Sequence, residues 1–402
     1  MLELEEAVEN ILSQIEPLPP ETVSLSNAHG RYSAQPFVSG VDLPPFDNSA
    51  MDGYAVLASD VVAPTSDHPV LLRLTGKVAA GETFAGTITP GTCVRIFTGS
   101  PLPPGADAVV MQEDTRVDTN DTDKIWITDS VKPLENVRFR GEDVRAGMPI
   151  LQAGERLTGP VCGLLGATGI AFASVFRQPI VGLLATGSEL VEPGQPLRPG
   201  QIYESNRVGL SGFIQNCGAI PKVYPLIEDT LDATVSAMEK AFSECDAVVT
   251  SGGVSVGEFD FVKAAFERLG GELSFWKVAI KPGKPFVFGR LNNKFLFGVP
   301  GNPVSALVTF FLLARPALLR LQGAVKVRPL SHPAILTMPI HNKGDRRHFV
   351  RVAVDEEANA HPTGIQASHI LSSLAKADGL VDVPPRTEFR QGSAVRVIRW
   401  DQ

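Results

Sequence analysis

The sequence predicts a multidomain α/β protein whose central parallel-sheet domain carries inserted β-rich domains and is followed by a C-terminal β domain. At 402 residues the chain is too long for one hydrophobic core. From Ile180 to Leu321, apolar strand-like runs alternate with helical patterns, as in repeated βα units. Short alternating runs rich in Val, Thr, Pro and Gly from Ser33 to Phe139 indicate small β units, and strand patterns return after Gln322.

Five parts are expected along the chain. Residues 1–26 form an N-terminal helix on the central domain, 27–45 with 144–176 an elongated linking domain, 46–143 an inserted β-rich lid, 177–325 the central α/β domain, and 326–402 the C-terminal β domain. Within the central domain we expect strands at 180–185, 222–226, 247–250, 286–288 and 295–299, and helices at 206–216, 231–243, 261–269 and 303–321.

Composition excludes several function classes. The net charge of -8 argues against a general nucleic-acid binder, because phosphate neutralisation needs surplus Lys and Arg. The four cysteines form no CxxC pair and the seven histidines form no HExxH, so any metal is expected to be oxygen-bound. The 37 Gly and 32 Pro indicate extensive loops, which is where binding chemistry is expected.

No export or membrane segment is expected. Residues 1–16 are acidic and helically patterned, unlike the basic start and apolar core of a signal peptide. The uncharged stretch from Leu157 to Phe176 contains several glycines and Pro160, so it is interpreted as a short helix followed by a strand. A cytoplasmic protein without membrane contact is the resulting prediction.

Three predicted strands of the central domain run directly into loops of small residues. These loops are Thr186 to Glu189, Thr250 to Gly253, and Pro300 to Pro303. In open parallel sheets, ligands bind at the carboxyl ends of strands, where small residues let backbone amides approach an anion. Each loop alone could be an ordinary βα turn, but together they predict one shared cleft.

The second of these loops continues into further polar residues. Ser251, Gly252 and Gly253 are followed by Ser255 and then by Asp260. Backbone amides of such a segment can hold a phosphate while a carboxylate serves a hydrated Mg²⁺. The chain lacks both GxxxxGK[ST] and GxGxxG, so the common nucleotide motifs do not explain the glycines.

Other candidate groups lie on either side of this loop. The polar segment from Phe46 to Val56 contains Asp52, and Thr98 lies in a stiff loop further along. Lys277, Lys281 and Lys284 place three ammonium groups on a chain stiffened by proline, which suits oxyanion binding. Solvated turns are the alternative interpretation of each segment.

These segments resemble those of the MoeA and gephyrin E-domain family of molybdenum insertases. The resemblance rests on residues 46–56, 98–107, 140–143, 186–190, 251–257, 281–285 and 299–305, in family order across nearly the whole chain. It implies an elongated homodimer of four-domain subunits, a MogA-like molybdopterin-binding central domain, and an active cleft that uses both subunits.

The resemblance also implies a reaction and its site. Molybdate would be inserted into adenylylated molybdopterin with Mg²⁺, releasing AMP. Catalytic positions would be Asp52, Asp143, Glu189 and Asp260; substrate-binding positions Thr98, Ser251, Gly252, Gly253, Ser255, Lys277, Lys281, Lys284, Pro300, Gly301, Asn302 and Ser368; and metal-binding positions Glu189, Asp229 and Asp260. Ser188 departs from the Asp that relatives often carry, which puts a metal role there in doubt.

Two alternatives remain open at this point. A MogA-like molybdopterin adenylyltransferase would need only the central domain, and the segments from Phe46 to Val56 and from Thr98 to Asp107 oppose it. A gephyrin-like scaffold would be favoured by a long linker and a fused second catalytic domain, and neither is apparent. Transient contacts with a MogA-type adenylyltransferase and with molybdoenzymes are further expectations from the resemblance.

Overall fold

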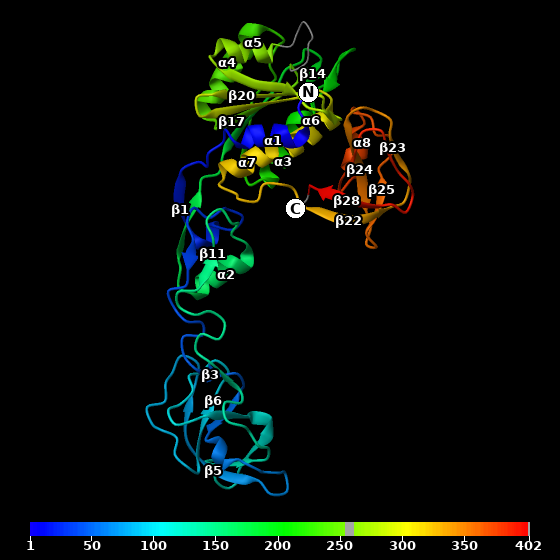
Figure 1. Cartoon of the computed structure of the whole chain (residues 1–402). Helices are drawn as coiled ribbons and strands as arrows, with labels where there is room; N and C mark the ends of the chain where they lie inside the picture. Colours follow the sequence, from blue (N-terminus) through cyan, green and yellow to red (C-terminus); the bar gives the residue numbers. More distant parts are fainter. Residues whose placement is uncertain (254–260, 401–402) are drawn as a thin grey trace. The chain divides into compact units, whose positions relative to one another are not determined.

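The computed structural model describes residues 1–253 and 261–400 and separates them into two compact units (Figure 1). The first unit contains Met1–Gln35, Ala153–Thr158 and Phe172–Gln402, and the second contains Pro36–Gln152 and Gly159–Ala171. This division is coarser than the five predicted parts, and its boundaries fall inside the predicted linking domain. The finer boundaries therefore stay predictions.

The centre of the first unit is a six-stranded sheet. Its order is β16 (Ile220–Val223), β13 (Ile180–Ala185), β17 (Ala247–Ser251), β21 (Lys294–Val299), β20 (Pro285–Leu291) and β18 (Glu272–Lys277). The first four strands are parallel, which confirms the predicted α/β core. Strand β16 begins two residues before the predicted range, and β18 was not predicted.

The expectation that Phe286 to Phe288 belongs to the parallel part of the sheet is wrong. Strand β20 pairs antiparallel with β21, and β18 pairs antiparallel with β20. Only Asn292 and Asn293 connect Leu291 to Lys294, and Asn292 has a φ of 55°. A two-residue connection can form a hairpin, whereas a parallel pair needs a crossover of about a dozen residues.

Helices cover both faces of this sheet (Figure 1). On one face lie α4 (Leu231–Glu244) and α5 (Val262–Arg268); on the other lie α1 (Leu4–Leu12), α3 (Asn206–Asn216), α6 (Pro303–Thr309), a π-helical turn η4 (Phe310–Ala314) and α7 (Arg315–Leu321). Alternate residues of one strand serve the two cores: Ala247 and Val249 face α3 and α6, and Val248 faces α4. Burial of both faces explains the apolar strand runs.

The stretch Pro303–Leu321 has the length and apolar character that a membrane-crossing helix would need. In this fold, however, 89% of its apolar window is buried inside the protein. It therefore has the burial of the core helix of a folded domain.

A β domain follows at the C-terminal end of the first unit. It contains β22 (Ser331–Leu336), β23 (Ile340–Asn342), β24 (Arg347–Val354), β25 (Asn359–Pro362), α8 (Leu371–Ala375), β26 (Gly379–Val383), β27 (Thr387–Phe389) and β28 (Ala394–Arg399). Pairing of β24 with both β25 and β26 closes the strands β24, β25, β22, β28 and β26 into a ring. Strand β19 (Ile280–Lys281) leaves the central region and pairs with β24, which ties the two sheets together.

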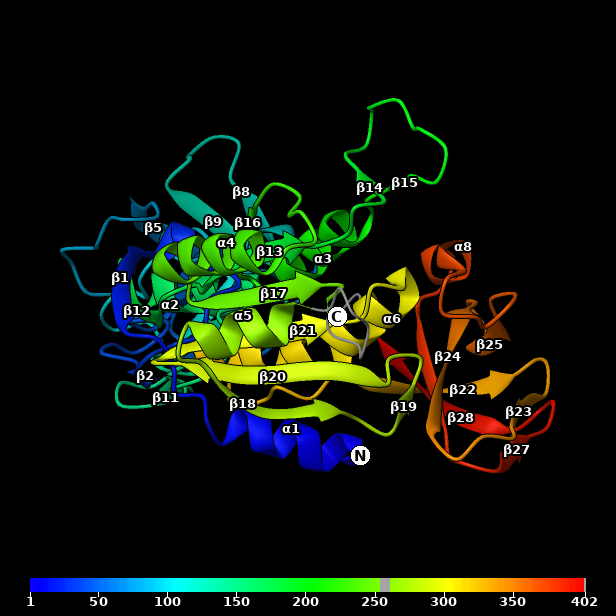
Figure 2. The same ribbon diagram turned by 90° about the horizontal axis from the view of Figure 1, so that it is seen from above.

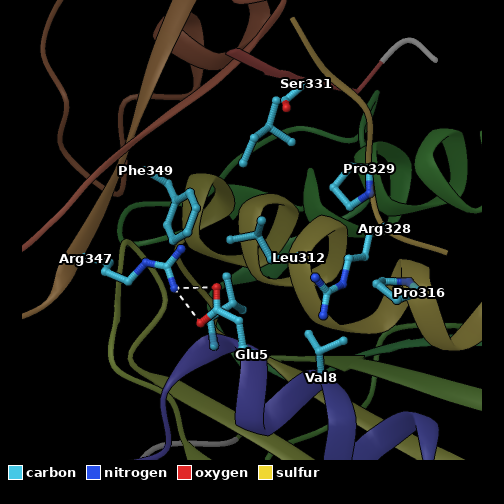
Figure 3. Close-up of a pocket in the computed structure, with 11 residues that line it drawn as sticks. Glu5, Val8, Leu312, Pro316, Arg328, Pro329, Ser331, Arg347 and Phe349 are labelled. Carbon is cyan, nitrogen blue, oxygen red and sulfur yellow. Dashed lines mark hydrogen bonds and ion pairs between the residues drawn. The ribbon is translucent and has the colours of Figure 1, made fainter. Parts of the chain in front are cut away.

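The N-terminal helix contacts this β domain through an ion pair and an apolar pocket (Figure 3). Arg347 Nη1 lies 2.6 Å and 2.7 Å from the two carboxylate oxygens of Glu5, and Arg347 also binds Asp382. The Arg347 hydrogen bond lowers the pKa of Glu5. Val8, Leu312 and other residues line a cavity of about 210 Å³ beside this ion pair.

The remaining elements of the first unit are short. They are β1 (Pro20–Ser24) paired with β12 (Phe172–Phe176), the 3₁₀ turn η1 (Leu25–Asn27), and β14 (Leu190–Val191) paired with β15 (Ile202–Tyr203).

The second unit is built on a six-stranded β-sheet, as predicted for an inserted β-rich part. Its order is β7 (Ala108–Met111), β4 (Gly53–Val56), β6 (Thr92–Ile96), β5 (Val70–Val78), β9 (Lys124–Ile127) and β8 (Thr115–Val117). The unit also contains β2 (Phe37–Val38) paired with β11 (Pro149–Leu151), β3 (Asn48–Ser49) paired with β10 (Val137–Arg138), η2 (Ala58–Asp60), η3 (Gln112–Asp114) and α2 (Gly159–Ala167).

Gly53 is a close-packing point of this second sheet. A Cβ atom at Gly53 would lie 1.9 Å from the carbonyl oxygen of Val110 on the neighbouring strand. We expect Gly53→Ala to lower the free energy of unfolding of this unit by about 3 kcal/mol, because backbone atoms must move apart. Gly40→Ala, where a Cβ meets nothing within 4 Å, is the matched control in urea unfolding. Equal stability of the two variants would contradict the packing argument.

Candidate functional site

The three small-residue loops of the central domain line one cavity of about 650 Å³, which confirms the predicted shared cleft. Backbone hydrogen bonds join the loops: Thr186 N donates to Ser251 O at 3.3 Å, and Gly252 N donates to Val299 O at 3.2 Å. In Figure 2 the arrow of β17 points toward α6, whose first residue, Pro303, also lines the cavity. The cleft therefore lies at the carboxyl ends of the parallel strands.

Predicted and unpredicted residues share this lining. The predicted residues Glu189, Asp229, Ser251, Gly252, Gly253, Gly301 and Asn302 are present. Pro300 is buried just before Gly301 but is outside the lining. Further lining residues that no sequence pattern indicated are Ile202, Tyr203, Glu204, Ser205, Asn206 and His369.

Backbone geometry requires glycine at two lining positions. Gly252 has a φ of +84° and Gly253 a φ of +67°, both in the left-handed region. A Cβ at Gly252 would lie 2.9 Å from the carbonyl oxygen of Thr186, and one at Gly253 would lie 2.7 Å from Val262. Side chains are thus excluded where this loop borders the cavity.

The described lining is acidic. Glu189, Glu204 and Asp229 contribute carboxylates, and no Lys or Arg occurs among the lining residues that the structure describes. Glu204 is already paired, because its carboxylate lies 3.0 Å from the Nε of buried Arg207. A phosphate-bearing ligand in this cavity would need an additional positive charge.

Asp229 is held in place by the loop after β13. Its Oδ2 accepts hydrogen bonds from the backbone N–H of Ser188 at 2.6 Å and from the Ser188 hydroxyl at 2.7 Å. Ser188 therefore orients an acidic residue of the cavity lining. Among residues 1–253 and 261–400, no group of three or more His, Cys, Asp or Glu is placed to hold a metal.

Two of the predicted site residues fall outside the described residues. Ser255, predicted to bind substrate, and Asp260, predicted to bind metal and act in catalysis, both lie in 254–260. Their roles remain predictions.

The three predicted lysines do not line this cavity. Lys277 ends β18, Lys281 ends β19, and Lys284 immediately precedes β20. A Cβ at Gly283 would lie 2.1 Å from Thr309 Oγ1, so this loop packs against α6, whose other end lines the cavity.

The predicted residue Ser368 lies next to the cavity rather than in its lining. Its carbonyl oxygen accepts the backbone N–H of Val304 in the first turn of α6, at 3.1 Å. The adjacent exposed residue His369 lines the cavity instead. No periodic pattern distinguished this histidine, because its approach depends on packing of the C-terminal β domain.

The second unit brings two other predicted residues together. Asp52 Oδ1 accepts the backbone N–H and the hydroxyl of Thr98, each at 2.8 Å. The backbone N–H and then the hydroxyl of Thr98 lower the pKa of Asp52. Asp52 is thus held as an exposed carboxylate with a defined orientation.

Asp143 belongs to a different part of the second unit. Its backbone N–H donates to Leu43 O at 3.1 Å, within the turn that includes Arg140. Arg140 Nε donates to Asp42 at 2.6 Å, and Arg140 N donates to Asp47 at 2.7 Å. No described hydrogen bond connects Asp143 with Asp52 or Thr98.

His348 lies beside the lysine-bearing strand, since Lys281 of β19 pairs with His348 of β24. The imidazole is buried, and its Nε2 has no hydrogen-bond partner among the described atoms. Burial, with a smaller contribution from Lys281, lowers the pKa of His348 to about 4.

Family models cover most of the chain. A model of the "MoeA N-terminal region (domain I and II)" matches residues 2–169, a "probable molybdopterin binding domain" matches residues 182–320, and the "MoeA C-terminal region (domain IV)" matches residues 333–400. The middle match contains the cavity-lining loops.

Relatives that align over nearly the whole chain indicate the same family as these models. A molybdopterin molybdenumtransferase of Haemophilus influenzae is 40% identical over 385 residues, covering 94% of this chain and 93% of that protein. Molybdopterin molybdenumtransferase 2 of Mycobacterium tuberculosis is 38% identical, with 95% of each chain covered. The crystal structure of the molybdopterin biosynthesis MoeA protein of Pyrococcus horikoshii superposes with a TM-score of 0.84 at 31% identity, covering 99% of each chain.

The buried imidazole of His348 predicts a pH effect on stability. The unfolded chain takes up this proton near the ordinary pKa of 6.5, but the folded protein does so only near 4. Stability is therefore lost as pH falls between these values, by up to about 3 kcal/mol from this group. In urea unfolding at pH 7 and pH 4.5, His348→Gln should lose less stability than the unmodified protein. Exposed His332→Gln is the control, and an unchanged pH dependence in His348→Gln would contradict the assignment.

Proposed function

The chain belongs to the MoeA family of molybdopterin molybdenumtransferases, and we propose that it inserts molybdate into adenylylated molybdopterin, releasing AMP and molybdenum-bound molybdopterin. Membership of this family makes it an enzyme of molybdenum cofactor biosynthesis. The adenylylated substrate, the release of AMP and the use of Mg²⁺ belong to the proposal.

The observation that carries the proposal is the cavity at the ends of β13, β17 and β21. Apart from His369, its lining residues lie within the part of the chain matched by the molybdopterin-binding model. Its glycine-lined wall lets a ligand approach the backbone, while Ser251 and Asn206 place polar groups beside it. Small residues and polar groups at strand ends suit a phosphate-bearing ligand.

Mg²⁺ fits the described donor groups of this cavity. Mg²⁺ is commonly held by one or two carboxylates together with substrate phosphates and water, so a cluster of three acidic residues is unnecessary. Glu189 and Asp229 line the same cavity, and Ser188 fixes the Asp229 carboxylate. These two residues, with Asp260 as an expected third, would hold the ion. When bound, it would neutralise charge on the phosphoryl oxygens.

The residues of this chain contribute binding and orientation rather than a covalent step. Ser251 and the adjoining glycines would hold the phosphate of the pterin, and Glu189 and Asp229 would position its charge-compensating cation. The lysines at 277, 281 and 284 would attract molybdate, an anion that must approach another anion before reaction. Molybdate would gain its sulfur ligands from the dithiolene of the substrate.

The homodimer is part of the same proposal. Asp52 and Thr98 form a defined polar pair on the second unit, and the family resemblance assigns them to a cleft that uses both subunits. We propose that this pair, with Asp143, completes the active cleft of a partner subunit. A MogA-type adenylyltransferase would supply the substrate, molybdoenzymes would accept the product, and the protein would work in the cytoplasm.

The central test is release of AMP. Purified protein with Mg²⁺ and adenylylated molybdopterin is expected to release AMP only when molybdate is added. Asp52→Ala should reduce the rate by about 100-fold, because an orienting carboxylate of the site is lost. Asp60→Ala, on the same unit but outside the predicted site, should keep near-normal activity. AMP release that is independent of molybdate would contradict the proposal.

Other outcomes would identify the alternatives. Adenylylation of molybdopterin from ATP without molybdate would favour a MogA-like adenylyltransferase. Binding of a partner protein without any AMP release would favour a scaffold. A monomer in sedimentation at micromolar concentration would contradict the shared cleft while leaving the reaction open to test.

The proposed Mg²⁺ ligands predict a second kinetic effect. Glu189→Gln and Asp229→Asn should each raise the Mg²⁺ concentration needed for half-maximal AMP release by about ten-fold or more, because a charged oxygen ligand is lost. Exposed Glu239→Gln on α4 is the matched control. If both variants release AMP with an unchanged half-maximal Mg²⁺ concentration, these residues are not ligands.

A further inference from the structure

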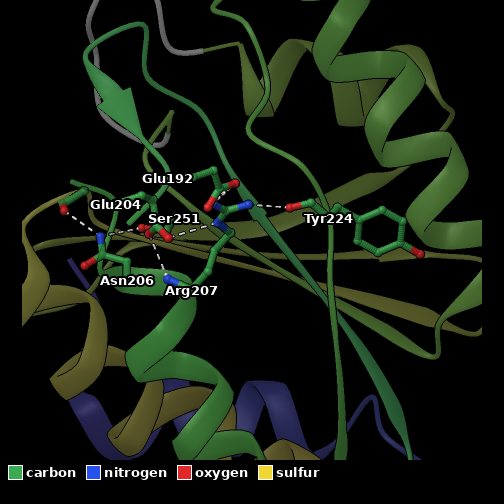
Figure 4. Close-up of polar contacts among 7 residues, drawn as sticks. Glu192, Glu204, Asn206, Arg207, Tyr224 and Ser251 are labelled. Carbon is green, nitrogen blue, oxygen red and sulfur yellow. Dashed lines mark hydrogen bonds and ion pairs between the residues drawn. The ribbon is translucent and has the colours of Figure 1, made fainter. Parts of the chain in front are cut away.

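Asn206 connects two of the loops that form the cavity (Figure 4). It is the first residue of α3, is 8% exposed and lines the cavity. Its side-chain nitrogen Nδ2 donates to Ser251 Oγ at 2.7 Å and to Gly301 O at 2.7 Å. The two bonds together use both amide protons. Ser251 ends β17, and Gly301 follows β21, so one side chain joins the ends of two strands.

The hydrogen bond from Asn206 Nδ2 to Ser251 Oγ determines where the Ser251 hydroxyl proton can point. A serine hydroxyl can accept hydrogen bonds but has only one proton to donate. Because Ser251 Oγ accepts from Asn206 Nδ2, and an amide nitrogen cannot itself accept a hydrogen bond, the Ser251 proton must point elsewhere. Ser251 also lines the cavity, where an oxyanion can accept that proton.

A buried ion pair holds Asn206 in this position. Arg207 and Glu204 have side chains that are only 3% and 2% exposed, with Nε and Oε2 separated by 3.0 Å. Glu204 Oε1 also accepts the backbone N–H of Arg207 at 2.8 Å, so it caps the first turn of α3. Arg207 makes further bonds to Glu192 and to the carbonyl oxygen of Tyr224. Glu204, two residues before Asn206, and Arg207, directly after it, are therefore fixed.

We propose that Asn206 is a positioning residue that orients the Ser251 hydroxyl as a hydrogen-bond donor to the phosphate of bound molybdopterin. This inference rests on the proposed function and deepens it. Asn206 itself does not contact the phosphate; it acts through Ser251. The competing role is purely structural, in which Asn206 matters because it holds the Gly301 loop.

A double-mutant cycle separates the two roles. Binding of purified molybdopterin would be measured by anaerobic calorimetry for the unmodified protein, Asn206→Ala, Ser251→Ala and the double variant. Each single change should weaken binding about ten-fold or more, because the hydrogen bond from Ser251 to the charged phosphate is lost. The double variant should bind within about three-fold of Ser251→Ala, because the residue through which Asn206 acts is already absent. Thermal unfolding would establish that each variant is folded.

Two further variants sharpen the test. Asn206→Asp keeps the side-chain shape but can only accept, so it should draw the Ser251 proton toward itself and bind molybdopterin no better than Asn206→Ala. Asn216→Ala, at the exposed end of the same helix, should bind like the unmodified protein.

The outcomes distinguish this inference from the proposed function. If the effects of Asn206→Ala and Ser251→Ala multiply in the double variant, or if Asn206→Asp binds normally, the positioning role is overturned while molybdopterin binding stands. If the unmodified protein does not bind molybdopterin, the proposed function and this inference both fail.

Discussion

The arrangement of the first unit depends on the in-register alignment of three parallel strands. Ala185, Ser251 and Val299 occupy one row across β13, β17 and β21. Each strand must leave the sheet just beyond that row, so three connections begin side by side. Because helices cover both faces, the edge at the carboxyl ends is where these connections can form a ligand cavity. The cavity is thus a consequence of strand register.

Electrostatics then determines what such a cavity can hold. Its described lining contains carboxylates and no Lys or Arg, whereas a molybdopterin ligand carries phosphate. Backbone amides and hydroxyls offset only part of the repulsion. Under the proposed function, a divalent cation held by Glu189 and Asp229 would resolve the conflict, and the lysine-bearing segment beyond α6 would then receive a second anion. Separate locations for acids and lysines suit a reaction that joins two anionic substrates.

Much of this organisation could be predicted from local sequence. Strand β13 and helix α3 have their predicted bounds, because apolar runs and helix-start residues are local signals. The antiparallel direction of β20 was missed because periodicity carries no information on strand direction; the short Asn292–Asn293 connection was the available signal. The three loops were recognised as one cleft because strand topology, rather than any single motif, brings them together.

The lining residues that local sequence did not indicate are placed by contacts between segments far apart in the chain. The sequence predicts Asn206 as the first residue of a helix, but no local pattern indicates that its neighbours Glu204 and Arg207 are buried. Their burial follows from packing against Tyr224 and Ser251, which are 17 or more residues away in the chain. A buried ion pair is costly unless its geometry is well satisfied, and breaking one partner leaves an unpaired charge. The pair beside Asn206 is therefore better explained by the orientation it imposes on the cavity wall than by stability alone.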